Sequence, residues 1–176
     1  MKNFTNEEAK YLIELPKKVY QNDNLVDTET IAIESSFSMR YNLISEDEPD
    51  YQFLLDVKQG KKNNLKFDLH FQENESITWL LRVDYNGQHQ NPEVANEFVP
   101  DFIRPYEGMW FEYSDHHIHY FVQGYKQLAW AVPLKSDSFP VKEITDFNSM
   151  KNAFIEFIKR VNIVTVFQFQ HEKLFL

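Results

Sequence analysis

The chain has 176 residues, within the ~100–200 residues that one domain usually spans, and its 16 phenylalanines and 9 tyrosines exclude a disordered chain. It has no cysteine and only 4 glycines, which excludes disulfides, thiolate zinc sites and the glycine-rich loops that cradle phosphates. The net charge of −9 repels nucleic acid, so nucleic acid is a disfavoured partner that would need a local basic site.

The first predicted element is a short helix that begins after Thr5. Thr5 and Glu8 have the spacing of a capping box, an apolar stripe follows, and Pro16 ends the helix. A polar linker is expected from there to about residue 30. Charged side chains interrupt the apolar core that a signal peptide needs, and no run approaches the ~18 apolar residues of a membrane span. We therefore expect a cytoplasmic protein without a membrane segment.

Four segments with a period of two come next, at residues 37–43, 51–58, 65–71 and 79–85. Apolar side chains at alternate positions are typical of half-buried antiparallel strands, and the polar turns between the segments predict a meander. The side chains expected to face the core are Phe37, Met39, Tyr41, Leu43, Phe53, Leu55, Val57, Leu65, Phe67, Leu69, Phe71, Trp79, Leu81, Val83 and Tyr85.

Residues 88–107 break this pattern because three prolines prevent regular structure, and a long ordered loop is expected there. Aromatic side chains alternate with carboxylates along this loop and onward to residue 113. The rings either pack onto the core or form a lobe that binds a basic protein surface. Trp110 and Phe111 are the expected anchors in both cases.

Three further strands are predicted at about residues 109–114, 116–123 and 127–133. A helix at 147–161 follows, with Asp146 or Ser149 as its cap, and the apolar tail from 163 to 170 predicts a last strand. The predicted fold is a single α+β domain over residues 1–176. Its antiparallel meandering sheet has about six or seven strands and is flanked by an N-terminal and a C-terminal helix.

The sheet face opposite the core is expected to be charged. Strand alternation places Asp56, Arg82 and Asp84 on this face, together with Lys58, Asp68 and His70. An ordinary solvated sheet face has this composition too, so the charge alone does not identify a site.

Three histidines make this face a candidate site. The spacing of His117 and His119 places both imidazoles on one side of a strand, and His89 follows the turn after Tyr85. With Arg82 they supply the acid, base and cation of a metal-independent nuclease, which makes these four the candidate catalytic residues. A pair of histidines needs a third ligand to hold a metal, for which His89 and Asp84 are only candidates, so we predict no metal and no cofactor. The candidate binding residues are Asp56, Asp84, Asn91, Trp110 and Phe111.

Several short motifs occur in an order that resembles a known family. They are Leu55-Asp56-Val57, Leu80-Leu81-Arg82-Val83-Asp84, Asn86-Gly87-Gln88-His89-Gln90-Asn91-Pro92, His117-Ile118-His119, Gly124-Tyr125 and Trp130-Ala131-Val132-Pro133-Leu134. Over residues 50 to 165 the chain resembles an uncharacterised domain family of bacteria and their phages, and the resemblance implies no activity. The family pattern reads Tyr-Arg-Glu where this chain has Phe121, Val122 and Gln123, so a proton acceptor and a cation are missing here.

Three functions follow from these features. The first is a non-enzymatic protein-binding or regulatory module of a phage or mobile element, with another protein as its partner. The alternatives are a small toxin-like endoribonuclease or phosphodiesterase that uses the histidines, and a self-assembling structural protein. In the last case the apolar segment Lys173–Leu176 pairs at a sheet edge and forms a homodimer.

Overall fold

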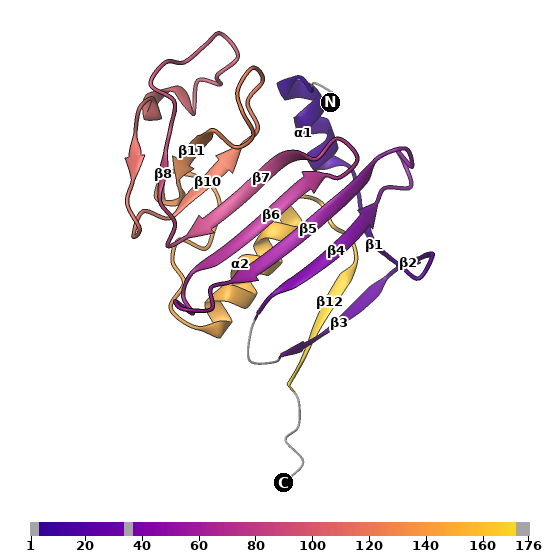
Figure 1. Ribbon diagram of the computed structural model, residues 1–176. Coiled ribbons are helices and arrows are strands. Elements are labelled where there is room, and N and C mark those ends of the chain that lie inside the picture. The colour runs from indigo at the N-terminus through magenta and orange to yellow at the C-terminus, as the bar shows by residue number, and fades with distance from the viewer. Residues whose placement is uncertain (1–3, 34–36, 172–176) are drawn as a thin grey trace.

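The computed structural model describes residues 4–33 and 37–171 (Figure 1). The main sheet consists of the strands β1 (Lys18–Gln21), β2 (Asn24–Val26), β4 (Met39–Ile44), β5 (Gln52–Gln59), β6 (Phe67–Glu73), β7 (Thr78–Tyr85), β10 (His117–Tyr120) and β11 (Trp130–Pro133). These eight strands follow the order β11-β10-β7-β6-β5-β4-β1-β2 with antiparallel neighbours. The α+β class and the antiparallel sheet are confirmed, but the prediction of about six or seven strands was too low.

Two strand pairs lie outside the main sheet. β3 (Thr28–Ile33) and β12 (Val166–His171) pair in parallel, whereas β8 (His89–Gln90) and β9 (Trp110–Phe111) pair antiparallel. β12 corresponds to the predicted last strand. The segment expected to pair with a second copy, Lys173–Leu176, lies outside the described residues.

The predicted polar linker before residue 30 was wrong, because β1, β2 and the start of β3 occupy it. Asn22 and Asp23 both have positive φ angles, 51° and 60°, as in the type I′ turn that joins two strands of a tight hairpin. Asparagine and aspartate tolerate this backbone better than most residues. The polar pair therefore marks a hairpin turn and not a linker.

The two predicted helices are α1 (Asn6–Glu14) and α2 (Phe147–Arg160), and Thr5 and Asp146 cap them in capping boxes. α2 lies across one face of the sheet, whereas α1 lies at one end of the strands beside β7 (Figure 1). Only α2 therefore covers the sheet in the way that the predicted flanking arrangement required. Within the described ranges, no helix is long and apolar enough to cross a membrane.

The sheet face toward α2 carries the core, and the predicted inward residues such as Leu69 and Val83 are fully buried there. Trp79 was predicted to face the same way, but it lines a pocket on the opposite face. The register between β6 and β7 shifts at Phe71 and Gln72, so that Trp79 pairs with Gln72. A β-bulge adds one residue and reverses the alternation beyond it, which explains the error.

One lysine is buried inside this core. Lys17 is 0 % exposed, and its Nζ donates hydrogen bonds to the carbonyl oxygens of Ile13 (3.0 Å), Leu15 (2.6 Å) and Val161 (2.9 Å). It also lies 5.1 and 5.0 Å from the ring centres of two core phenylalanines. The three carbonyls belong to the C-terminal ends of α1 and α2, where helix carbonyls have no partner within the helix. Lys17 therefore caps both helices at once.

Residues 88–115 form a lobe, called here the covering lobe, against β10 and β11 (Figure 1). It contains β8, β9 and the short 3-10 helix η1 (Arg104–Tyr106); a second one, η2 (Leu134–Ser136), follows β11. Asn91 fastens the lobe because its Nδ2 donates to the carbonyls of Tyr106 and Ala131, both at 2.8 Å. Its Oδ1 accepts from the Ala131 amide, also at 2.8 Å. The predicted ordered loop is thus built onto the sheet.

Candidate functional site

Two rows of charged and imidazole side chains cross the sheet face that points away from α2, called here the polar face. Direct cross-strand neighbours form one row of Arg40, Asp56, His70, Arg82 and His119 and a second row of Lys58, Asp68, Asp84 and His117. Antiparallel register sets these rows, because opposite residues of neighbouring strands point to the same face. The rows contain an open pocket and a covered histidine cluster.

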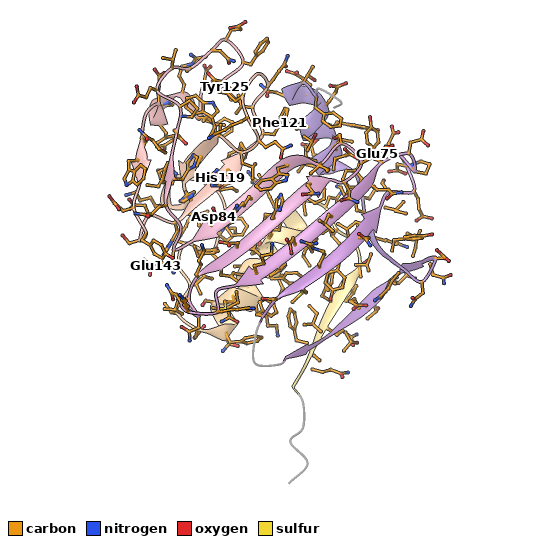
Figure 2. The ribbon with its side chains drawn as sticks, in the orientation of Figure 1. Glu75, Asp84, His119, Phe121, Tyr125 and Glu143 are labelled. Carbon is orange, nitrogen blue, oxygen red and sulfur yellow. The ribbon has the colours of Figure 1, made fainter. Side chains whose placement is uncertain are left out.

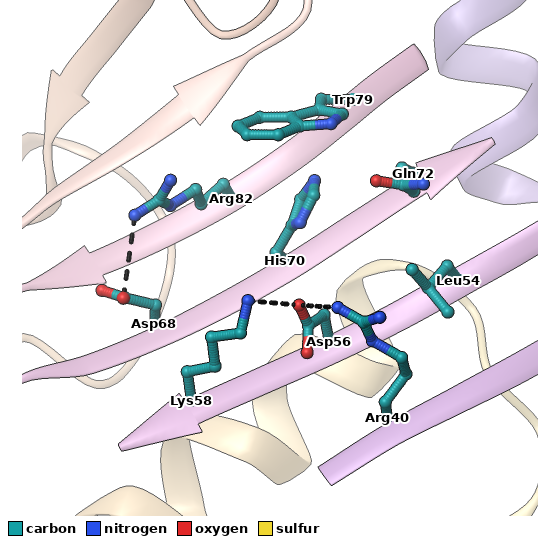
Figure 3. Close-up of a pocket in the computed structure, with 9 residues that line it drawn as sticks. All are labelled: Arg40, Leu54, Asp56, Lys58, Asp68, His70, Gln72, Trp79 and Arg82. Atoms are coloured by element: carbon teal, nitrogen blue, oxygen red, sulfur yellow. Dashed lines mark hydrogen bonds and ion pairs between the residues drawn. The ribbon is translucent and has the colours of Figure 1, made fainter. Parts of the chain in front are cut away.

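The open pocket has a volume of about 200 Å³ and lies over β4 to β7 (Figure 3). The residues that line it are Arg40, Leu54, Asp56, Lys58, Asp68, His70, Gln72, Trp79 and Arg82. The indole of Trp79 forms one wall, with its ring centre 4.5 Å from that of His70. The pocket is therefore mainly polar, with one flat aromatic surface.

Two cations meet one carboxylate at the pocket. Asp56 Oδ2 lies 2.9 Å from Arg40 Nη2 and 2.8 Å from Lys58 Nζ. Burial raises the pKa of Asp56, but the hydrogen bonds from Arg40 and Lys58 outweigh it and hold that pKa below the ordinary 3.8. The side chains of Arg40 and Lys58 are 61 % and 62 % exposed, so their remaining donors are open to a ligand.

Two buried polar atoms at the pocket wall lack a hydrogen-bond partner among the described residues. They are Asp68 Oδ1 and His70 Nε2. Burial, followed by the charge of Asp84, raises the pKa of Asp68 to about 6. Burial, followed by the charge of Arg82, lowers the pKa of His70 to about 4. Unsatisfied buried polar atoms and shifted pKa values together are typical of functional sites.

The histidine cluster lies beside the pocket, on β7 and β10. Asp84 Oδ2 is 3.3 Å from His119 Nε2 and 3.7 Å from His117 Nε2 (Figure 2 labels Asp84 and His119). Asp84 Oδ1 accepts a 2.5 Å hydrogen bond from Arg82 Nε, and Arg82 Nη2 lies 3.7 Å from Asp68. Arg82 therefore connects the cluster to the pocket.

The second ring nitrogen of each histidine is bound to the backbone. His117 Nδ1 is 2.7 Å from the Asp115 carbonyl oxygen, and His119 Nδ1 is 2.9 Å from the Leu128 carbonyl oxygen. A carbonyl oxygen only accepts, so each Nδ1 carries the hydrogen and donates it. In the neutral rings, both Nε2 atoms then present lone pairs toward Asp84.

The covering lobe closes over this cluster. The ring of His89 lies 4.5 Å from that of His119, and the ring of Phe111 lies 4.6 Å from that of His117, centre to centre. His117 is 0 % exposed, His119 is 4 % exposed and Asp84 is 6 % exposed. Burial, followed by the charge of His119, lowers the pKa of both His89 and His117 to about 4. These two imidazoles are therefore neutral near pH 7, and His117 is shielded from solvent.

The structure brings most of the predicted site residues together. The cluster contains five of them: His89, His117, His119, Arg82 and Asp84. Asn91 Oδ1 lies 3.0 Å from His89 Nε2. Asp56 lies in the pocket, and Trp110 and Phe111 lie in the covering lobe. Of the last two, Trp110 is 49 % exposed whereas Phe111 is buried against His117, so only Trp110 is available to a partner.

Of the residues that line the pocket, only Asp56 and Arg82 were predicted as site residues, and two of the others show why. The alternation correctly placed Arg40 on the outward side of its strand. Its position directly opposite Asp56 depends on the register between β4 and β5, which the sequence alone did not give. Trp79 was assigned to the core because no sequence signal marked the bulge at Leu80, the residue after it.

Comparison with known proteins identifies the family. A family model described as a family of unknown function, DUF6978, matches residues 4–163. The chain belongs to the DUF6978 family. No curated protein and no solved structure matched it. In this DUF6978 protein, the residues matched by the family model include all those of the pocket and of the cluster, whereas β12 lies after the matched range.

Proposed function

We propose that this DUF6978 protein is a non-enzymatic binding module and that its pocket on the polar face takes a small phosphorylated ligand. The observation that carries the proposal is the convergence of three cations, Arg40, Lys58 and Arg82, on one small pocket of an acidic chain. A guanidinium keeps several donors after one ion pair, and the ammonium keeps two. A phosphate group would accept from these remaining donors.

Two further features support a phosphorylated ligand. Lys61, Lys62 and Lys66 follow Lys58 along the turn between β5 and β6, which makes this the most basic stretch of the sequence and attracts an anion over distance. Trp79 offers a flat face on which a planar ring can stack. The volume of about 200 Å³ is below the ~300–1,000 Å³ of most ligand pockets, so the ligand is small or enters only in part.

Burial of the histidines favours binding over nuclease action. His89, His117 and His119 converge as a nuclease would require, but a phosphodiester must come within ~3 Å of the acid and the base. The 0 % exposure of His117 and the Phe111 ring against it prevent such an approach. The resembled motif pattern has an arginine and a glutamate where this chain has Val122 and Gln123, which supports the same choice.

Calorimetric titration with inorganic phosphate and with nucleoside monophosphates tests the proposal. We expect Lys58→Gln to weaken binding by about 10- to 100-fold, because it removes one charged hydrogen bond of ~1.5–3 kcal/mol. Lys10→Gln is the matched control, since Lys10 is an exposed lysine on α1 that does not line the pocket. Absence of binding to all these compounds, or equal binding by both variants, would refute the pocket as the site.

A specific observation favours a second function, docking of a basic protein on the covering lobe. Four of its aromatic side chains are 40–55 % exposed: Phe98, Phe102, Trp110 and Tyr113. Six carboxylates and a single arginine lie between residues 91 and 115. Arg104 and Asn96 hold the lobe by hydrogen bonds within it and to Gln123, which displays the rings on an ordered surface.

Affinity capture from host lysate separates this function from the first. We expect a basic partner that binds the wild type and Lys58→Gln equally, and that is lost with Trp110→Ala and at high salt. Capture of no stoichiometric partner, or unchanged capture by Trp110→Ala, would contradict docking on the lobe.

The biological setting is a further part of the proposal. The motif resemblance supports a cytoplasmic protein of a phage or mobile element, and gene neighbourhood tests this directly. Self-assembly into a homodimer is the third proposal, because β3 and β12 form a ribbon with two outer edges that no described strand covers. Light scattering that shows a monomer, unchanged by removal of residues 172–176, would exclude it.

A further inference from the structure

Three hydrogen-bond acceptors converge in the histidine cluster. The lone pairs of His117 Nε2 and His119 Nε2 face Asp84 Oδ2, and the three atoms lie within 4.8 Å of one another. His117 Nε2 is fully buried and has no hydrogen-bond partner among the described residues. Acceptors repel one another unless a proton or a metal cation lies between them. We infer that Asp84, His117 and His119 bind a divalent transition-metal ion of the Zn²⁺ class.

The two distances from Asp84 Oδ2 fit such an ion, whereas the two imidazole nitrogens lie within 4.8 Å of each other and come to about 3.4 Å when both bind it. Zn²⁺ binds imidazole nitrogen and carboxylate oxygen at ~2.0–2.2 Å with tetrahedral geometry. Two ligand atoms of a tetrahedron with such bonds are about 3.4 Å apart. The observed separations of 3.3 and 3.7 Å between the carboxylate oxygen and the two imidazole nitrogens bracket this value.

The surroundings of the ligands match those of metal sites. Histidines that bind a metal usually donate their other ring N–H to a carbonyl or carboxylate, and both Nδ1 atoms here do so to backbone carbonyls. Arg82 occupies Asp84 Oδ1, which leaves Oδ2 as a single ligand atom. Two imidazoles and one carboxylate favour Zn²⁺ or a similar transition metal over Ca²⁺ and Mg²⁺, which prefer oxygen ligands.

The site is covered, and this defines its role. All three ligands come from β7 and β10, and Phe111 and His89 pack on the histidine rings from the covering lobe. An ion there joins two strands at the base of the lobe, so we assign it a stabilising role. The inference does not depend on the proposed phosphate pocket, because none of the three ligands lines that pocket.

The alternative without a metal is an imidazolium that pairs with Asp84. A second proton on His119 would give its Nε2 a hydrogen to donate across the 3.3 Å to Asp84. It would still leave His117 Nε2 buried and without a hydrogen bond, whereas one metal ion satisfies all three atoms. The two explanations differ in what they predict for added metal.

The test uses the full chain without an affinity tag of histidines. We expect the protein as purified to hold about one Zn²⁺ by elemental analysis, and the chelated protein to take up about one Co²⁺ with the intense visible absorption of tetrahedral cobalt. Added Zn²⁺ should raise the Tm of the chelated protein by several degrees, because it binds only the folded chain. A protein without bound Zn²⁺ that also shows neither response overturns the inference.

Variants locate the ion. His117→Ala, His119→Ala and Asp84→Asn should each weaken Co²⁺ binding by at least about 100-fold. His116→Ala is the matched control, because His116 is the next residue but its Nδ1 accepts from the Asn86 amide, away from the cluster. Retained binding in the three ligand variants, or an equal loss in the control, shows that the ion binds elsewhere and overturns the site.

A measurement on the wild type keeps the test valid if these variants do not fold. Nitrogen-15 spectra of the imidazoles should show Zn²⁺ shifting the Nε2 signals of His117 and His119 while their Nδ1 atoms stay protonated. Shifts at Nδ1, or at other histidines only, overturn the assignment. Loss of phosphate binding alone would refute the proposed pocket function and would leave these signals unchanged.

Discussion

Replacement of Lys17 by methionine tests whether one amine holds the ends of both helices. Methionine has a similar length, but it donates nothing to the three carbonyl oxygens that Lys17 Nζ reaches at 2.6–3.0 Å. A buried acceptor left without a partner costs ~1–3 kcal/mol, and three of them cost several. Methionine avoids the cost of burying a charged amine, and this offsets part of the loss in stability. We expect a net loss of about 2–3 kcal/mol at pH 7.

The same lysine gives the prediction a pH signature. Burial lowers the pKa of Lys17 from 10.5 to about 7. Between these values the unfolded chain binds more protons than the folded chain, so the free energy of unfolding contributed by Lys17 rises with pH. The difference in the free energy of unfolding between wild type and Lys17→Met should therefore grow by about 2 kcal/mol from pH 7 to pH 9.

Equilibrium urea unfolding at both pH values, followed by tryptophan fluorescence, measures these differences. Lys18→Met is the control, because Lys18 is the adjacent lysine but pairs with Asp27 at the surface, where such pairs are worth less than ~1 kcal/mol. Equal stability of the two variants at pH 7, or a difference that does not grow by pH 9, would refute the role assigned to Lys17.

Three further substitutions test the fold by thermal or urea unfolding. Asn91→Ala should destabilise the protein by about 2–4 kcal/mol, because the amide hydrogen bonds that join the covering lobe to β11 are buried; a loss below ~1 kcal/mol would contradict this. Phe111→Ala should cost about 3–5 kcal/mol and the exposed neighbour Trp110→Ala less than ~1, and the reverse order would show that the β9 assignment is wrong. Asp146→Ala removes the cap of α2 and should lower Tm by about 2–4 °C, whereas an unchanged Tm would argue against the capping box.

Local patterns predicted the centre of this fold well. The alternation of residues such as Phe53, Leu55 and Val57 reports burial on one face, and a strand of that kind needs no distant information to be recognised. One local pattern was misinterpreted, and one local feature left no signal in the sequence. The turn at Asn22 and Asp23 was taken for a linker, and no composition marks the bulge at Leu80 that turns Trp79 to the polar face.

The site was predictable in its residues but not in its arrangement. Spacing alone placed His117 and His119 on one face, and the order of the strands then decided that Asp84 and Arg82 lie opposite them. In that order β10 pairs with β7, although the residues of the covering lobe separate the two strands in the sequence. Such a long-range pairing cannot be read from local periodicity. Burial of the histidines, which changes their chemistry, follows from the packing of Phe111 and was equally hidden.

The contacts between β1–β3 and the segment that follows α2 have a consequence for how the protein is made. Thr165 Oγ1 accepts from the Val19 amide, 146 residues earlier, and β12 completes β3 in parallel. Closing a loop of that length costs about 4 kcal/mol of chain entropy, which the contacts recover only at the end. During synthesis β1 can pair early with β2 and β4, whereas β3 waits without its strand partner until β12 emerges. This region is where we expect nascent chains to depend most on chaperones.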